Sequence, residues 1–253
     1  MNSRRERYLE EMGLGPVWRL RRRGQKPAAA TQDASGPHAA PRKLSPQPAP
    51  GKNADTTLDL ADDRAARILA MEWPELKAAV AGCDACPLHK TRTKTVFGVG
   101  DEQADWLLVG EAPGAEEDAR GEPFVGQAGR LLDNMLAAIG LNRGKNVYIC
   151  NVLKCRPPGN RNPAPFEVAQ CSPHLLRQLE LIKPKLIVAM GRFAAQTLLD
   201  TEATIASLRG KLHRYRGVPL VVTYHPAYLL RSLPDKAKAW EDLCFARRTM
   251  ASL

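Results

Sequence analysis

Four of the six cysteines in this 253-residue sequence are placed so that they could bind metal. Cys83 and Cys86 form a Cys-x-x-Cys pair, whereas Cys155 and Cys171 follow much later in the chain. Two thiolate pairs can complete four-coordination around zinc or around a [4Fe–4S] cluster. The spacing matches neither a tandem zinc ribbon nor the ferredoxin run, so both metals stay open, beside the alternative of four reduced cysteines without a ligand.

Two turns between the cysteine pairs carry other side chains that could do chemistry. Residues 110–114 read Gly-Glu-Ala-Pro-Gly, and residues 123–126 read Pro-Phe-Val-Gly. A clasp of thiolates closed around these loops suggests that the loops form a site whose shape the clasp maintains. Cys150 and Cys244, by contrast, fall in a predicted strand and a predicted helix, and we interpret them as small core residues.

The elements that must position these residues alternate between strands and helices. Continuous apolar runs predict strands at 106–109, 147–152, 186–190 and 218–223. Apolar side chains at helical spacing predict helices around 131–139, 175–182 and 236–249. Continuous apolar strands separated by helices predict a parallel sheet that is covered on both faces.

Polar motifs follow each predicted strand. Glu111 comes after the first strand, Asn151 ends the second, Gly191 follows the third and His225 follows the fourth. Sites in open parallel sheets form at the carboxyl ends of the strands. Four independent motifs at this edge of the sheet therefore predict that it carries the site.

The chain divides into three parts by composition. Residues 1–24 form a basic segment with scattered apolar side chains, which suggests a short helix or a docking peptide. Residues 25–58 are rich in Ala and Pro and cannot bury enough apolar surface to offset their chain entropy, so we interpret them as a disordered linker. Residues 59–253 are expected to form the folded domain.

Composition also limits the class of protein. No apolar run approaches the roughly 20 residues of a membrane span, and none follows the basic N-terminus as in a secretory signal. We therefore expect no membrane association and a reducing, cytoplasmic setting, in which cysteines bind metal or stay free. The net charge of +10 and the pI of about 9.5 are compatible with a nucleic-acid partner, although another basic soluble protein would show the same balance.

From about residue 70 to the C-terminus, the motifs resemble those of the family 4 uracil-DNA glycosylases, the iron–sulfur type of bacteria and archaea. They are long and occur in a fixed order: Cys-Asp-Ala-Cys-Pro-Leu-His-Lys-Thr-Arg, Val-Phe-Gly-Val-Gly, Val-Gly-Glu-Ala-Pro-Gly, Pro-Phe-Val-Gly-Gln-Ala-Gly, Asn-Val-Leu-Lys-Cys-Arg-Pro-Pro and His-Pro-Ala-Tyr-Leu-Leu-Arg. The N-terminal segment and the linker lie outside the resemblance and inherit nothing from it.

The resemblance implies a three-layer α/β/α sandwich around a central four-stranded parallel sheet, the uracil-DNA glycosylase fold. It also implies that Cys83, Cys86, Cys155 and Cys171 hold a [4Fe–4S] cluster that supports loop structure and takes no part in the reaction, which decides between the cluster and zinc. The implied reaction is hydrolysis of the bond between uracil N1 and deoxyribose C1′. The enzyme is expected to be monofunctional, to leave an abasic site and so to initiate base excision repair.

A uracil flipped out of the stack needs a stacking face, a reader of its edge and stabilisation of the departing anion. The resemblance gives the face to Phe124, which could otherwise be a core aromatic in a tight loop. Asn151 offers a donor to uracil O4 and an acceptor to N3–H, a pattern that cytosine reverses, although an Asn here could also cap its own strand. His225 can donate to uracil O2, where negative charge grows, and a neutral imidazole is expected to suffice.

Glu111, Ala112 and Pro113 are expected to shape the pocket. In better-known uracil glycosylases a similar turn carries an aspartate that steadies the cationic sugar and the attacking water, whereas the aligned place here holds Ala112. Family 4 shares this absence, so the group that activates water stays open, with Glu111 as a candidate. Glu111 is expected to lie against uracil C5, where it would exclude the methyl group of thymine, and backbone groups of Ala112 and Pro113 are expected to complete the pocket.

Basic and apolar side chains around the last predicted strand are candidates for DNA contact. Arg209 and Lys211 precede this strand and Arg231 follows it, where they suit phosphate groups, although a solvated basic face would look the same. Tyr228 or Leu229 could wedge into the gap left by a flipped base, although adjacent apolar residues are also typical of a core.

Two other functions are compatible with these residues. One is a zinc- or cluster-bearing nucleic-acid-binding module without catalysis, which uracil release would exclude. The other is an enzyme on free nucleotides, which the lack of a Gly-x-x-x-x-Gly-Lys-Ser/Thr phosphate loop disfavours. We expect a monomer that acts on single- or double-stranded uracil-containing DNA, with the N-terminal segment available to tether it to a repair or replication partner.

Overall fold

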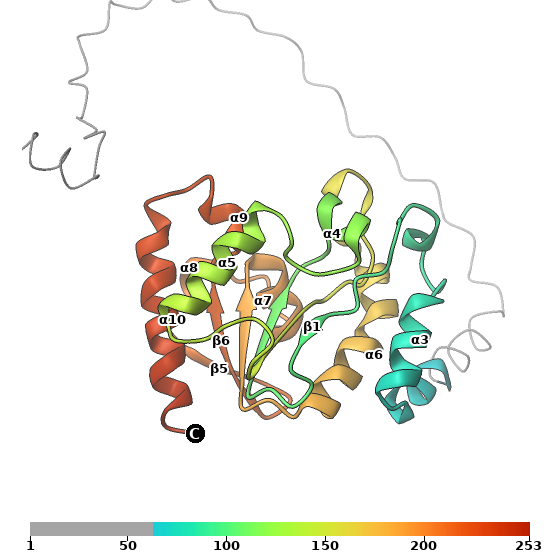
Figure 1. Ribbon diagram of the computed structural model, residues 1–253, viewed down its shortest axis with the longest axis horizontal. Coiled ribbons are helices and arrows are strands. Elements are labelled where there is room, and N and C mark those ends of the chain that lie inside the picture. The colour runs from blue at the N-terminus through green and yellow to red at the C-terminus, as the bar shows by residue number, and fades with distance from the viewer. Residues whose placement is uncertain (1–62) are drawn as a thin grey trace, which may run out of the picture. The chain divides into compact units, whose positions relative to one another are not determined.

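The computed structural model describes residues 63–253, and the predictions for residues 1–24 and 25–58 lie outside this range. Its centre is a six-stranded sheet in the order β1-β3-β2-β4-β6-β5 (Figure 1). The four inner strands run parallel, as predicted, and are β2 (Trp106–Gly110), β3 (Val147–Asn151), β4 (Leu186–Met190) and β6 (Val218–Thr223). All four coincide with the apolar runs of the sequence, because strands buried on both faces need apolar side chains at every position.

The sheet is wider than the predicted four parallel strands, because one short antiparallel strand is added at each edge. β1 (Val99–Gly100) pairs with β3, and β5 (Leu212–Tyr215) pairs with β6, both antiparallel. β1 is too short to leave a pattern in the sequence, and β5 alternates exposed and half-buried side chains in a basic stretch. The turn between β5 and β6 places Arg216 and Gly217 at positive φ, the conformation of a tight hairpin turn.

Helices cover both faces of the sheet. The strand side chains point alternately to the two faces, so neighbouring residues such as Leu107 and Leu108 belong to different core clusters. One face packs on α6 (Pro165–Ile182), α7 (Arg192–Leu199) and α8 (Ile205–Leu208). The other packs on α5 (Gln127–Ala138) and α10 (Asp235–Met250), which completes the predicted three layers.

The shorter helices lie around the loops. They are α3 (Trp73–Ala81), η1 (Pro87–Lys90), α4 (Ala115–Arg120), η2 (Pro158–Asn160) and α9 (Pro226–Leu229). Figure 1 shows α3 beside α6 at one end of the molecule, and residues 63–70 are also helical. Across residues 63–253, no helix is both long and apolar enough to cross a membrane.

The strand register aligns the ends that matter for the site. Gly110 at the end of β2 pairs with Asn151 at the end of β3, and Met190 at the end of β4 pairs with Thr223 at the end of β6. The residues that follow these ends therefore emerge together at the carboxyl edge of the parallel strands, where open sheets of this class bind their ligands.

Candidate functional site

The predicted pocket begins at the paired ends of β2 and β3. A Cβ atom on Gly110 would lie 2.4 Å from Asn151 Oδ1 and 2.7 Å from Phe124 Cζ, so only glycine fits between these two side chains. Asn151 is 2% exposed, and its Oδ1 has no hydrogen-bond partner among the described residues. A buried carboxamide oxygen without a partner is costly, which indicates an acceptor kept for a ligand.

Phe124 is buried beside Gly110 and has an unusual backbone conformation. Its φ of 55° is unusual for a residue with a side chain, so the surrounding contacts must impose it. Arg143 does so by donating to the carbonyls of Pro123 (2.8 Å) and Phe124 (2.9 Å). The Phe124 ring stacks on His225, with ring centroids 5.4 Å apart and 28° between the planes.

The two loops that carry the pocket are joined by one carboxylate. Glu117 Oε2 accepts the backbone N–H of Gly114 (3.1 Å), and Glu117 Oε1 accepts that of Val125 (2.9 Å). Gly114 closes the turn after β2, whereas Val125 directly follows Phe124. Glu117 therefore fixes the distance between the two turns that the sequence singled out.

His225 has a defined tautomer. Its Nδ1 accepts the backbone N–H of Ala227 (3.1 Å), so the proton of the neutral ring must sit on Nε2. The pKa of His225 is lowered to about 4, chiefly by burial; Glu117 opposes the shift and Arg231 adds to it. The side chain is thus a neutral Nε2–H donor near pH 7, as expected from the sequence.

The turn after β2 places Glu111 at the same edge. Burial raises the pKa of Glu111, and the nearby Arg192 at the start of α7 acts against that rise. Pro113 is buried and Ala112 half-buried. Ala112 packs on the small apolar cluster of Leu88, Leu153 and Cys155, so this turn is also in contact with the cysteine region.

Replacing Gly110 by alanine is expected to lower activity by about 10-fold to 100-fold, because the new methyl group must displace Asn151 or Phe124 and misplacements of this size carry such costs. Single-turnover rates and the melting temperature of the variant would test this. Gly82→Ala is a matched control, since Gly82 has an ordinary φ of −88° and a Cβ there would meet only the carbonyl of Ala78, at 3.7 Å. An active Gly110→Ala protein would show that the two side chains need not lie at this spacing.

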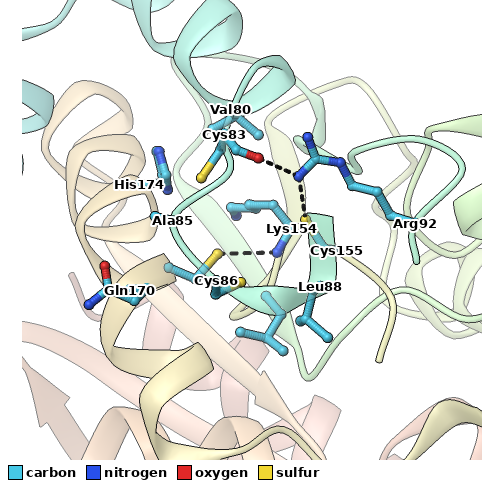
Figure 2. A pocket seen from close by; sticks show the side chains of 12 residues that line it. Val80, Cys83, Ala85, Cys86, Leu88, Arg92, Lys154, Cys155, Gln170 and His174 are labelled. Carbon is cyan, nitrogen blue, oxygen red and sulfur yellow. Dashed lines mark hydrogen bonds between the residues drawn. The ribbon is translucent and has the colours of Figure 1, made fainter. Parts of the chain in front are cut away.

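The four predicted cysteine ligands lie around a single cavity. Figure 2 shows Cys83 and Cys86 facing Cys155 across it, and Cys171 also lines it. The ligands come from the loop after α3, from the segment after β3 and from α6, three regions that are distant in sequence. All six cysteines are free, and Cys150 is buried in the core as predicted, whereas Cys244 on α10 is only half-buried.

Three of these sulfur atoms already accept hydrogen bonds. Arg92 donates to Cys155 Sγ (3.1 Å) and to the carbonyl of Cys83 (2.7 Å), as drawn in Figure 2. Arg64 donates to Cys83 Sγ (3.5 Å), and the backbone N–H of Lys154 donates to Cys171 Sγ (3.3 Å). Such donors stabilise thiolate charge, and hydrogen bonds to sulfur are typical of iron–sulfur sites.

Burial affects the protonation of the predicted ligands. Within residues 63–253, no group of three or more His, Cys, Asp or Glu side chains is arranged to hold one metal ion. Burial raises the pKa of the Cys86, Cys155 and Cys171 thiols, that of Cys171 to about 12. Thiols in this environment become good ligands only when a metal displaces their protons.

The predicted DNA contacts differ in how exposed they are. Lys211 and Arg231 are exposed. Arg209 already donates to Asp242 (3.2 Å) and to Glu241 (2.9 Å), so its guanidinium anchors α10.

The two apolar candidates also differ. Leu229 is buried at 1% exposure, in contrast to Leu230, which is 39% exposed. Tyr228 is 39% exposed, and its hydroxyl donates to Asp235 (2.7 Å). Tyr228 also stacks on Tyr224 with ring centroids 5.3 Å apart, so its ring is held in place by neighbouring side chains.

Several positioning residues were not identified from the sequence. The position of Glu117 is a weak indication of its role, since a Glu at the third position of a helix can accept the backbone N–H of the residue before the helix, here Gly114. Arg92, Arg143 and Lys154 look like ordinary surface cations in the sequence, because charge alone does not reveal that a side chain donates inward to carbonyls or sulfur atoms.

Comparisons with known proteins agree with these features. The model of the uracil DNA glycosylase superfamily matches residues 97–244. A type-4 uracil-DNA glycosylase of Archaeoglobus fulgidus is 53% identical over 159 residues, 60% of this chain and 79% of that protein. Proteins of the same description from Thermotoga maritima (47% over 161 residues, 63% and 83%) and Pyrobaculum aerophilum (41% over 181 residues, 68% and 92%) are also similar.

Proposed function

The chain belongs to the uracil DNA glycosylase superfamily, and we propose that it excises uracil from DNA as a type-4 enzyme. The reaction is hydrolysis of the N1–C1′ bond, which leaves an abasic site for base excision repair. The observation that carries this proposal is the buried Oδ1 of Asn151 at the end of β3, which has no partner among residues 63–253; a Cβ on Gly110 would meet both this atom and the Phe124 ring. This oxygen is suited to accept N3–H of uracil, and cytosine has no proton there.

The remaining steps follow from the neighbouring groups. Extracting the base from the stack costs a few kcal/mol, which stacking on Phe124 and hydrogen bonds in the pocket offset. The Nε2–H of His225 donates to uracil O2 and stabilises the charge that develops as the bond to N1 breaks. A fixed neutral donor needs no reorganisation during this step. Glu111 shapes the C5 side of the pocket and excludes thymine.

We infer that Cys83, Cys86, Cys155 and Cys171 hold a [4Fe–4S] cluster. The cavity they line and the hydrogen bonds to three sulfur atoms support a metal centre here, and the similarity to type-4 enzymes favours a cluster over zinc. The cluster would supply no redox step to hydrolysis. Its contribution is to join the loop after α3 to the segment after β3, on which the Glu111–Pro113 turn packs.

DNA phosphates are contacted in this proposal by Lys211 and Arg231, which are exposed. Arg209 supports this face from within, and α9, which carries Tyr228 and Leu229, is the element proposed to approach the gap left by the base. The enzyme acts as a monomer in the cytoplasm on single- or double-stranded DNA. Residues 1–24, tethered by residues 25–58, are proposed to reach a repair or replication partner.

The rate of excision is expected to show no inflection near pH 6.5, the ordinary pKa of histidine. The pKa of His225 is lowered to about 4, so the ring stays neutral and keeps its Nε2–H donor as pH falls through 6.5. Single-turnover rates between about pH 5 and about pH 8 would check this. An acid limb centred near 6.5 that is absent from His225→Gln would contradict it.

The proposal itself is tested with labelled oligonucleotides that carry one uracil, thymine or cytosine. After incubation, alkali cleaves abasic sites, and a strand break only at uracil is the expected result. Free deoxyuridine nucleotide serves as the competing substrate. No break with protein that holds its iron would favour a binding module without catalysis and would remove the assigned roles of Asn151 and His225.

A further inference from the structure

Lys154 is a buried cation next to the proposed uracil pocket. It is 2% exposed and ranks among the largest fully buried side chains of the described residues. Its Nζ donates to the backbone carbonyl of Asn151 (2.8 Å) and to Gln178 Oε1 (2.6 Å). Neither acceptor carries a charge. Burying an ammonium group against neutral oxygens is unfavourable, and an apolar side chain of the same length would fill the space.

The bond to Asn151 explains what the ammonium group does there. Asn151 is the last residue of β3, and its side-chain Oδ1 has no partner among the described residues. The direction of its carboxamide therefore depends on how its own peptide is held. Lys154 holds the carbonyl of that peptide, and so limits rotation of the residue that reads the base.

Lys154 is itself held from three sides. Gln178 on α6 is fully buried and donates through Nε2 to the carbonyl of Phe97 (3.0 Å). The backbone carbonyl of Lys154 accepts the N–H of Val96 (2.8 Å), and its backbone N–H donates to Cys171 Sγ. The Lys154 side chain thus links Gln178 on α6 to the end of β3, and its backbone N–H links the same residue to Cys171.

We propose that Lys154, together with Gln178, is a positioning residue for Asn151 and a determinant of the discrimination between uracil and cytosine. The inference rests on the proposed function. Misorientation of the carboxamide weakens the bonds to N3–H and O4 after the base has been flipped, when the transition state forms. The rate of the bond-breaking step should therefore change more than the affinity for DNA.

The test is Lys154→Met, which removes the ammonium group but keeps the side-chain length and the backbone N–H to Cys171. We expect wild-type iron content and visible cluster absorption, KM within about 3-fold of wild type, and kcat lower by about 10-fold to 100-fold. The ratio of uracil to cytosine excision should also fall. Wild-type kcat and discrimination would overturn the inference, and so would loss of iron in step with activity.

Variants at Gln178 test the inference if Lys154→Met does not fold. Gln178→Met removes one acceptor of Nζ and should lower kcat in the same direction, whereas Gln178→Glu restores an acceptor and should recover part of it. In a double-mutant cycle the effects of Lys154→Met and Gln178→Met should not add, because both act through one network. Additive effects would overturn it. Wild-type protein assayed alongside separates the two proposals, since an inactive wild type refutes the function itself.

Discussion

Replacing His225 by alanine is expected to lower the single-turnover rate of uracil excision by about 10²-fold to 10³-fold, the usual cost of removing one donor to a developing anion. The donor atom is Nε2, because Nδ1 accepts the backbone N–H of Ala227 and the proton of the neutral ring must then lie on Nε2. Uracil O2 carries little charge before the bond breaks. Binding of uracil-containing DNA should therefore change much less than the rate.

His225→Gln and His213→Ala are the matched variants. Glutamine keeps an N–H donor of similar reach, so its rate should lie between those of wild type and His225→Ala. His213 lies on the edge strand β5, and its Nε2 forms a hydrogen bond with the carbonyl of Leu208 (2.8 Å). The rate of His213→Ala should therefore stay within about 3-fold of the wild-type rate. A His225→Ala rate close to wild type, with folded protein, would show that the anion is stabilised by another group.

Gly191 leaves the space into which His225 packs. Gly191 has a φ of 92°, and a Cβ atom there would lie 2.9 Å from the Cβ of His225. From the sequence, the two residues were predicted to follow the third and fourth strands of the sheet. The sequence could not show that the glycine leaves the space into which the histidine loop packs, because this depends on the register of β4 and β6.

The inner layer of the fold could be predicted because burial on both faces leaves continuous apolar runs. The edge strand β5 could not be predicted, because it has one exposed face and its charged residues are equally typical of a DNA-binding loop. Arg209 illustrates the same limit. It was expected to contact DNA, and in the structure its guanidinium is paired with Asp242, which is 1% exposed.

The positions of Glu111, Asn151 and His225 at the carboxyl edge of the sheet were predicted because a motif and a strand end coincide there, whereas their roles stay predictions. The residues that hold these groups in place did not follow from the sequence. Lys154 stands beside Cys155 in a motif whose charge suggests solvent, yet it is buried. Such residues are found only when their hydrogen bonds are known, since they act by donating to carbonyls that every residue possesses.

The cysteine cavity and the proposed uracil pocket are connected by direct contacts. Lys154 touches Asn151 through its side chain and Cys171 through its backbone, and Ala112 packs on Leu153 and Cys155. A change in the cysteine region should therefore reach the pocket through packing. No electron transfer is needed for this coupling, as expected for a hydrolytic reaction.

Cys83→Ala should accordingly abolish cluster binding and lower both soluble yield and stability. Removing one of four ligands opens the clasp between the loop after α3 and the segment after β3. If the clasp contributes as much as a native cross-link, about 2–5 kcal/mol, the melting temperature should fall by about 5–20 °C. Iron content, visible absorption and thermal unfolding measure this directly, without reference to activity.

Cys244→Ala is the control, because Cys244 is a half-buried cysteine on α10 that does not line the cavity. It should keep wild-type iron content and a melting temperature within about 2 °C. Retention of iron by Cys83→Ala would remove Cys83 from the ligand set. Zinc in place of iron in the wild-type protein would refute the cluster while leaving the clasp intact. Loss of iron with unchanged stability and excision would show that the pocket is held by its hydrogen bonds alone, with Glu117, Arg143 and Lys154 sufficient to fix it.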